Sequence, residues 1–244
     1  MTTDSAPSSA PATRKRRGFL MFLRDVLVII VIAALVSFVV KTFVVRSFYI
    51  PSASMERTLL VNDRILVDEL TPRWTNYSRG DVVVFKDPGG WLDPQPQTPA
   101  PPPLVGAIDW VLNLVGISAT DSQDHLVKRV IGLPGDHVVC CNALGQITIN
   151  GAPIDELSYL NLPAGDTAAS NTPFDVVVPK DSLWLLGDNR DRSRDSREHQ
   201  DLPSGGFVPL SNVVGKAFLT TWPLDRFGLI DGHHDVFNGV PESE

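Results

Sequence analysis

The stretch Asp81-Val82-Val83-Val84-Phe85-Lys86 is typical of a buried β-strand, because four consecutive β-branched or aromatic residues stand between charged ones. Further short runs of this kind follow along most of the chain, at residues 63–68, 126–131, 136–140, 147–149, 175–178, 182–186 and 213–221. Asn150-Gly151, directly after one of them, is a turn signal and predicts a hairpin. Many short strands with few helical patterns predict an all-β fold, a sandwich or a barrel.

The segment before the first strand is apolar, and residues 26–40 contain no charge. This run is shorter than the about 20 residues that cross a bilayer, but apolar residues continue it on both sides. We therefore expect one transmembrane helix over residues 22–45. The alternative is a cleaved signal peptide, since Ser52-Ala53-Ser54 has the small-x-small pattern of a processing site. Charged residues and a proline near that pattern favour the uncleaved anchor.

Charge is unevenly distributed along the 244 residues, which carry a net charge of -7. Residues 1–25 hold five of the 21 basic residues but only two of the 28 acidic ones, and Arg14-Lys15-Arg16-Arg17 stands just before the apolar segment. By the positive-inside rule this cluster places the N-terminus in the cytoplasm. The remainder is acidic and lacks a basic stripe, so the composition argues against a nucleic-acid partner.

Residues 87–124 interrupt the β pattern. Residues 93–103 are rich in proline, which predicts an extended and flexible stretch. Residues 104–118 are mostly apolar, with Asp109 as their one charged residue, and predict a short helix. Two interpretations of that helix stay open: it packs on the sheet, or Trp110 and its neighbours enter the membrane interface.

Cys140 and Cys141 are the two cysteines of the chain, and they are adjacent. Neighbouring strand residues point to opposite faces, so a disulfide between them requires a distorted backbone. We favour two small, partly buried residues, with a vicinal disulfide or an intermolecular bridge as the alternatives. Two cysteines without histidines close by do not form a structural zinc site.

Ser54 follows Ile50-Pro51 just beyond the apolar segment, and Lys128 lies in a later predicted strand. A serine hydroxyl needs a base within hydrogen-bond reach, and a lysine is a base only when its amine is neutral. Burial among apolar side chains lowers the pKa of a lysine, and four aliphatic residues flank Lys128. Together the two residues are typical of a serine–lysine peptidase, although each by itself fits an exposed lysine or a turn serine.

A third segment, residues 187–197, reads Gly-Asp-Asn-Arg-Asp-Arg-Ser-Arg-Asp-Ser-Arg. Its alternating charges are compatible with an exposed loop whose ion pairs contribute little to stability. A calcium loop is disfavoured, because arginines stand between the acids and the required glycine and terminal glutamate are absent. We favour a hydrogen-bonded loop that fixes neighbouring side chains.

In their order along the chain, these segments resemble the conserved boxes of bacterial type I signal peptidases, a family of membrane serine–lysine peptidases. The resemblance extends from about residue 48 to residue 218 and includes residues 79–85, 128–136, 187–197 and 206–209. It implies an antiparallel β-sheet or barrel domain behind one N-terminal transmembrane helix. It further implies removal of N-terminal signal peptides from secreted preproteins after small residues (Ala-x-Ala), without a metal or an organic cofactor.

The resemblance also implies roles for individual residues. Ser54, directly before Met55, matches the nucleophile, and Lys128 matches its general base. Ser52 matches the hydroxyl that donates to the oxyanion together with the Ser54 N–H, and Ser193 matches the serine that holds the lysine amine. The supporting residues are Asp188, Arg190, Asp195 and Arg197, and the shallow pockets are lined by Phe48, Ile50, Pro51, Met55, Leu59 and Val127.

Two positions depart from the family pattern: Arg57 stands where proline is usual, and Ala53 stands where glycine is frequent. The histidines offer no better site. Asp124 and His125 are adjacent in a predicted strand and would not readily meet, which disfavours a triad with a serine. His233-His234 lie in a polar tail and are expected at the surface.

We therefore expect four parts: a disordered cytoplasmic tail (1–18), an anchor (19–46), an extracytoplasmic peptidase domain (47–228, with the insertion 87–124) and a C-terminal tail (229–244). The expected partners are secretory preproteins and the lipid bilayer of the plasma membrane. Two other functions remain open. One is a catalytically inactive, membrane-tethered peptide-binding domain. The other is a self-cleaving soluble regulator with the same chemistry, which the anchor disfavours.

Overall fold

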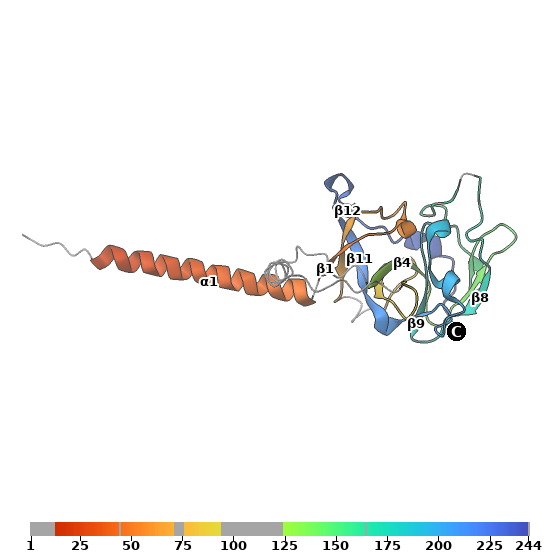
Figure 1. Cartoon of the computed structure of the whole chain (residues 1–244), viewed down its shortest axis with the longest axis horizontal. Coiled ribbons are helices and arrows are strands. Elements are labelled where there is room, and N and C mark those ends of the chain that lie inside the picture. Colours follow the sequence, from red (N-terminus) through yellow and green to blue (C-terminus); the bar gives the residue numbers. More distant parts are fainter. Residues whose placement is uncertain (1–12, 44, 71–75, 94–123, 164, 244) are drawn as a thin grey trace, which may run out of the picture. The chain divides into compact units, whose positions relative to one another are not determined.

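The computed structural model describes residues 13–43, 45–70, 76–93, 124–163 and 165–243 (Figure 1). The chain divides into two compact units, Met1–Thr42 and Phe43–Glu244. The first is helical, and the second is built mainly of β-strands. The helix expected over residues 104–118 lies outside the described residues.

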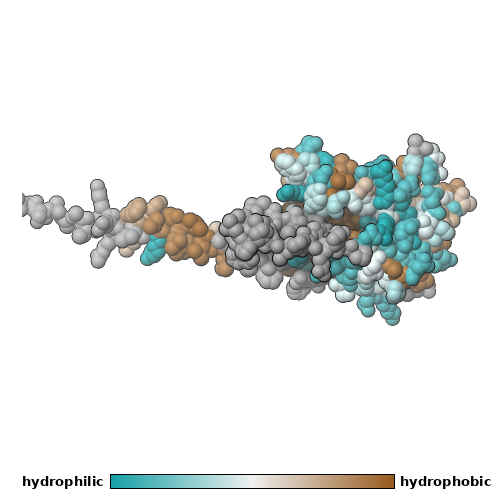
Figure 2. Space-filling view, viewed as in Figure 1, coloured by the Kyte–Doolittle hydropathy of each residue, from teal (hydrophilic) through white to brown (hydrophobic). Residues whose placement is uncertain are grey.

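Helix α1 (Thr13–Phe43) forms where the sequence predicts a helix. Residues 13–18 belong to it, contrary to the prediction of a disordered tail over residues 1–18, because lysine and arginine are good helix formers. Large apolar side chains such as Phe22, Ile29 and Leu35 are exposed on α1, and Figure 2 shows them as a brown surface. In the part of the chain that the structure describes, no helix combines the length and the apolar character that a bilayer crossing requires.

The larger sheet has eight strands, and all of its pairings are antiparallel. In spatial order they are β1 (Val45–Tyr49), β2 (Arg64–Asp68), β11 (Val213–Trp222), β3 (Val82–Lys86), β4 (His125–Gly132), β9 (Ser182–Leu186) and β10 (Val208–Pro209), with β12 (Gly228–Leu229) beside β11. The predicted all-β fold with an antiparallel sheet is thereby confirmed.

A second, four-stranded antiparallel sheet contains β7 (Ala152–Pro153), β6 (Thr148–Ile149), β5 (His137–Cys140) and β8 (Phe174–Val177). The predicted hairpin forms here, since β5 pairs with β6. Asn150 and Gly151 connect β6 to β7 with φ angles of 51° and 81°. Two consecutive positive φ angles are the requirement of a type I′ turn, which explains the Asn-Gly pair.

Short 3₁₀ helices connect the strands: η1 (Ala53–Met55), η4 (Arg190–Arg192), η5 (Ser196–His199), η6 (Leu210–Asn212), η7 (Leu224–Arg226) and η8 (His234–Phe237). Helix η8 anchors the C-terminal segment, because its Phe237 is buried in an apolar cluster that contains residues of both sheets. The Pro241 carbonyl accepts hydrogen bonds from Arg79 and Asn150. The expected C-terminal tail is therefore packed on the body from η8 onward.

The two cysteines are joined to each other by a disulfide, so the interpretation that we favoured, two unlinked residues, is wrong. Cys140 ends β5 and is buried, and Cys141 is half-buried in the following turn. The peptide bond that joins them is cis, and the backbone departs here from the regular strand on which the sequence argument was based.

Candidate active site

Ser54 and Lys128 lie side by side although 74 residues separate them in the chain, with 2.8 Å between Lys128 Nζ and Ser54 Oγ. Ser54 belongs to η1, the turn that follows β1, and Lys128 belongs to β4. Both side chains are buried, with exposed fractions of 6% and 3%. A hydroxyl and an amine at this distance form a hydrogen bond along which a proton can pass.

Burial changes the acidity of the Lys128 amine. It disfavours the ammonium form and lowers the pKa of Lys128 from 10.5 to about 8, even though the Asp195 and Asp188 carboxylates raise it. At pH 7 a group with this pKa is neutral in about one molecule in ten, whereas an ordinary lysine is almost wholly charged. The environment predicted from the aliphatic flanks of Lys128 is therefore present.

The backbone holds both groups in place. The Val127 carbonyl accepts a hydrogen bond from the Lys128 amine over 3.0 Å, which directs the amine back toward Ser54. The Ser54 carbonyl accepts from the N–H of Asn189 over 3.0 Å. Gly187 packs against that same carbonyl so closely that a Cβ at position 187 would lie 2.5 Å from it. Only glycine fits there, because any side chain would push η1 away from Lys128.

Ser52 lies next to the serine pair, with 3.2 Å between its Oγ and Ser54 Oγ. Its side chain is exposed, whereas that of Ser54 is buried. The Ser52 hydroxyl is thus available on the open side of Ser54, at the entrance to the site.

Asp195 and Arg197 form the ion pair that the sequence predicted, with 2.8 Å between Oδ2 and Nη2. Asp195 also accepts from the Gly187 N–H over 2.9 Å. Burial opposes the charged carboxylate, but the hydrogen bonds and the charge of Arg197 outweigh it and lower the pKa of Asp195 below its usual range. The pair therefore holds Gly187, and through Gly187 the Ser54 loop.

Asp188 and Arg190 are also buried, but each pairs with a residue that the sequence did not indicate. Asp188 accepts two hydrogen bonds of 2.8 Å from Arg129 and one from Thr58. Arg190 pairs with Glu156, which also accepts from the Tyr159 hydroxyl over 2.5 Å. Arg129 follows Lys128 directly, and two consecutive basic residues in a buried strand point to opposite faces, so each needs its own compensation.

Replacing Arg129 by methionine is expected to lower the free energy of unfolding by about 3–5 kcal/mol, because the Asp188 carboxylate loses its partner while it remains buried. Urea unfolding followed by tryptophan fluorescence measures the change. Arg194→Met is the matched control, since Arg194 pairs with Asp93 at 3.1 Å but both side chains are more than half exposed. Its expected cost is below about 1 kcal/mol, and equal costs for the two variants would contradict the argument.

Ser193 is buried against Gly187, close to the serine–lysine pair. Among the described side chains, however, its hydroxyl forms no hydrogen bond with the Lys128 amine, whose partners are Ser54 and Val127. Ser193 instead contributes to the lowered pKa of Asp195. The role that the resemblance implied for this serine is not visible in the geometry.

Most of the residues predicted to line small pockets gather in one apolar cluster. Phe48, Ile50, Met55 and Leu59 are each at most 2% exposed in this cluster, and Val127 packs against it. Pro51 is exposed beside them. Met55 and Val127 are the chain neighbours of Ser54 and Lys128, so the cluster borders the pair.

Arg57 replaces the family's proline in a turn whose backbone differs. Its φ angle is 91°, which a proline ring cannot adopt. The Arg57 guanidinium donates to the Leu160 carbonyl over 2.5 Å, so the side chain fixes this turn against a distant loop. The other departure, Ala53, lies in η1 without a positive φ angle.

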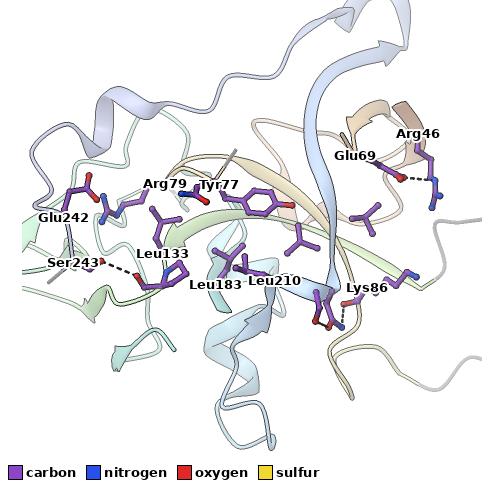
Figure 3. A pocket seen from close by; sticks show the side chains of 16 residues that line it. Arg46, Glu69, Tyr77, Arg79, Lys86, Leu133, Leu183, Leu210, Glu242 and Ser243 are labelled. Atoms are coloured by element: carbon purple, nitrogen blue, oxygen red, sulfur yellow. Dashed lines mark hydrogen bonds and ion pairs between the residues drawn. The ribbon is translucent and has the colours of Figure 1, made fainter. Parts of the chain in front are cut away.

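A cavity of about 650 Å³ lies elsewhere on the body (Figure 3). Tyr77, Leu133, Leu183 and Leu210 line its middle, and Arg79 and Glu242 lie at one end. It contains none of the predicted site residues. Within the described ranges, no group of three or more histidine, cysteine or acidic residues is arranged to hold a metal ion.

Comparisons with known proteins give one consistent result. The family model "Signal peptidase, peptidase S26" matches residues 23–222. Signal peptidase I of Mycobacterium tuberculosis (strain ATCC 25618 / H37Rv) is 38% identical over 242 residues, covering 93% of this chain and 80% of the relative. Probable signal peptidase I of Mycobacterium leprae (strain TN) is 38% identical over 224 residues, covering 82% and 76%.

Among solved structures, the crystal structure of a signal peptidase I from Enterococcus faecalis V583 matches with a TM-score of 0.35 and 24% identity. It covers 58% of this chain and 97% of that chain.

Proposed function

The chain belongs to the signal peptidase family, peptidase S26, and from this premise we propose that it cleaves signal peptides by a serine–lysine dyad of Ser54 and Lys128. Family membership makes it a peptidase that processes preproteins. The dyad is our inference, and the observation that carries it is the 2.8 Å contact between a buried amine and a buried hydroxyl.

In the proposed reaction, Ser54 Oγ attacks the carbonyl carbon of the scissile bond while Lys128 Nζ takes the hydroxyl proton. The resulting ammonium gives this proton to the leaving amine, and the mature chain departs from an acyl-enzyme. Lys128 then takes a proton from water, the hydroxide attacks the ester, and Ser54 recovers its proton. A pKa of about 8 suits this alternation, because the amine both accepts and releases a proton near neutral pH.

Negative charge develops on the carbonyl oxygen in both steps. We assign its stabilisation to the Ser52 hydroxyl and the Ser54 N–H, which the resemblance implies as donors. Support comes from the position of Ser52, exposed and 3.2 Å from Ser54 Oγ. Removal of one such donor typically costs a few kcal/mol of transition-state stabilisation.

Strand β4 supplies a binding edge for an extended substrate. Its residues Arg129, Val130 and Gly132 pair with β9, and among the described strands this pairing does not extend to residues 126–128. We propose that the substrate segment before the cleavage site pairs with β4 along residues 126–128, opposite Ile50-Pro51-Ser52. Side chains at alternate substrate positions then point toward the apolar cluster of Phe48 and Val127.

This geometry predicts a preference for Ala-x-Ala sites. A preprotein with alanine at the residues −1 and −3 before the cleaved bond is expected to release its mature chain. Changing the −1 alanine to leucine is expected to lower kcat/KM by about 100-fold or more, because the tightly packed cluster must open for the larger side chain. The same change at position −2 is the control. Equal cleavage of all three substrates, measured by mass spectrometry of the products, would show that the apolar cluster does not discriminate between substrate side chains.

We further propose that α1 anchors the enzyme in the plasma membrane, with the N-terminus in the cytoplasm and the β body outside. The charge-free residues 26–40 and the preceding basic cluster support this topology. The strand end and loop at residues 222–229 add exposed apolar side chains suited to the membrane interface, namely Trp222, Leu224, Phe227 and Leu229.

Extraction of membranes with alkaline carbonate tests this anchor. The full chain is expected in the membrane pellet, because this treatment removes peripheral proteins only. A chain that begins at Arg46 is the control and is expected in the supernatant. Release of the full chain by carbonate would contradict the anchor and leave the proposed cleavage chemistry untouched.

A further inference from the structure

The Cys140–Cys141 disulfide lies against a loop that supports the candidate active site. The two Sγ atoms are 3.8 and 3.9 Å from the carbonyl oxygen of Ser170. Cys140 is 7% exposed, whereas Cys141 is half-buried and is therefore the more accessible of the two residues. Ser170 lies between β7 and β8, in the connection between these two strands of the smaller sheet.

A continuous chain of buried contacts leads from Ser170 to the dyad. The Ser170 hydroxyl accepts a hydrogen bond from Arg197 Nη1 over 2.9 Å. Arg197 binds Asp195 through Nε and Nη2, both over 2.8 Å. Asp195 accepts from the Gly187 N–H, and Gly187 packs against the Ser54 carbonyl. Ser170, one of the residues that bind the Arg197 guanidinium, is thus also the residue that contacts the disulfide.

Stabilisation of the fold does not account for this disulfide. A disulfide stabilises mainly by closing a loop in the unfolded chain, and the effect grows with the length of that loop. A bond between neighbouring residues closes the shortest loop that a chain offers. The Cys140–Cys141 bond therefore contributes little to the stability of the fold, and a chemical role explains its presence better.

We propose that Cys140–Cys141 is a reversible redox site whose state tunes the serine–lysine dyad through Ser170 and Arg197. This inference rests on the proposed function. The chemical partner is a dithiol reductant, and the oxidised disulfide is the fully active form.

Reduction follows ordinary thiol–disulfide exchange. A thiolate of the dithiol attacks Cys141 Sγ, the S–S bond breaks, and Cys140 leaves as a thiolate that takes up a proton. The second thiol of the reductant resolves the mixed disulfide, which releases Cys141 as a thiol and the reductant as its own disulfide. Two electrons and two protons enter the protein. Each sulfur then carries an S–H and needs more room beside the Ser170 carbonyl, since a non-bonded S–S contact is longer than a bond.

The expected consequence is electrostatic. The charged groups around the Lys128 amine are Asp195 and Asp188, which favour its ammonium form, and Arg197, which opposes it. Movement of Ser170 loosens the hold of Arg197 on Asp195, so that the carboxylate charge is less compensated. The ammonium form of Lys128 is then stabilised relative to the neutral amine, which is populated only at higher pH.

The experiment uses the full chain in detergent and a peptide substrate without cysteine, and it records kcat/KM against pH before and after treatment with dithiothreitol. Reduction is expected to move the acidic limb upward by about half a pH unit or more, which lowers kcat/KM at pH 7 by about threefold. The plateau at high pH stays unchanged, unlike the uniform loss that general damage produces. Reoxidation restores the first profile.

Two variants locate the coupling. Cys140→Ser/Cys141→Ser is expected to show one profile with and without dithiothreitol. Ser170→Ala lacks the hydroxyl that binds Arg197. Its profile of kcat/KM against pH is expected to be shifted upward before any treatment and to stay unchanged when dithiothreitol is added. If either variant fails to fold, the reversible change of the natural chain still decides the question.

Superimposed oxidised and reduced profiles would overturn the redox site, and so would two free thiols in protein purified under air, counted by alkylation and mass spectrometry. In either case the chain as purified still cleaves substrate, and the proposed function stands. An oxidised natural chain that cleaves no preprotein would instead remove the proposed function.

Discussion

Replacing Ser54 by alanine is expected to reduce kcat for preprotein cleavage by about 10⁴-fold or more while substrate binding persists. The alanine removes the only atom that bonds covalently to the substrate in the proposed mechanism, and the Lys128 amine cannot replace it from its buried position. The rest of the site remains, because the Ser54 carbonyl, which Asn189 and Gly187 hold, is unchanged.

A mass-spectrometric cleavage assay with a preprotein measures this loss. Ser211→Ala is the matched control: Ser211 is exposed in η6, and its variant is expected to cleave at the natural rate. Full activity in Ser54→Ala would exclude this serine as nucleophile. Absence of cleavage by the natural chain, together with unchanged peptide binding in both proteins, would favour the membrane-tethered binding domain.

Replacing Lys128 by methionine is expected to abolish cleavage to a similar degree, because no other base contacts the Ser54 hydroxyl among the described residues. The natural enzyme is expected to gain kcat/KM about tenfold for each pH unit below pH 8 and to level off above it, since neutral amine is the active form. A flat profile between pH 6 and 9 would contradict lysine as the base.

The same substitution is expected to stabilise the protein. The pKa of Lys128 is lowered to about 8 in the fold from 10.5, which corresponds to a cost of about 3 kcal/mol. Because the folded-state pKa lies below the unfolded one, the fold disfavours the charged amine. The cost is fully present below about pH 8 and disappears as the pH rises toward 10.5.

Lys128→Met is therefore expected to unfold at higher urea concentration than the natural chain at pH 7, and the difference is expected to vanish near pH 10.5. Lys180→Met, at an exposed position, is the control and is expected to change neither activity nor stability appreciably. If Lys128→Met were less stable than the natural chain at pH 7, the fold would favour the charged amine of Lys128 rather than disfavour it. The base would then have to be sought elsewhere.

Local pattern was sufficient to predict the class of fold, and the family resemblance was needed to predict the candidate pair. The β-branched runs became antiparallel strands, the Asn150-Gly151 signal became a turn with two positive φ angles, and Ser54 and Lys128 meet. The family resemblance was what paired residues 54 and 128, because no periodic pattern in the sequence relates them. We expected burial among the aliphatic residues around Lys128 to lower its pKa, and burial does lower it.

The partners of the buried charges were not predictable in this way. Arg129 pairs with Asp188 and Arg190 pairs with Glu156, and these pairs are set by how strands and loops stack rather than by spacing. The resemblance gave Asp188 and Arg190 as supporting residues without partners, and those partners lie far away in the sequence, Arg129 in β4 and Glu156 after β7. The disulfide was only an alternative because it requires an irregular backbone, which local pattern did not indicate at the end of β5.

The contacts of the C-terminal segment have a consequence for biosynthesis. The Gly232 carbonyl accepts from the Arg129 guanidinium over 3.0 Å, and Phe237 fills part of the apolar interior. A nascent polypeptide that has not yet reached these residues lacks the Gly232 carbonyl and the Phe237 ring. Arg129 then lacks one of its hydrogen-bond acceptors, and the apolar interior is incomplete. The body around Arg129 is completed only when residues 232–237 have been synthesised, which is after the segments that carry Ser54 and Lys128.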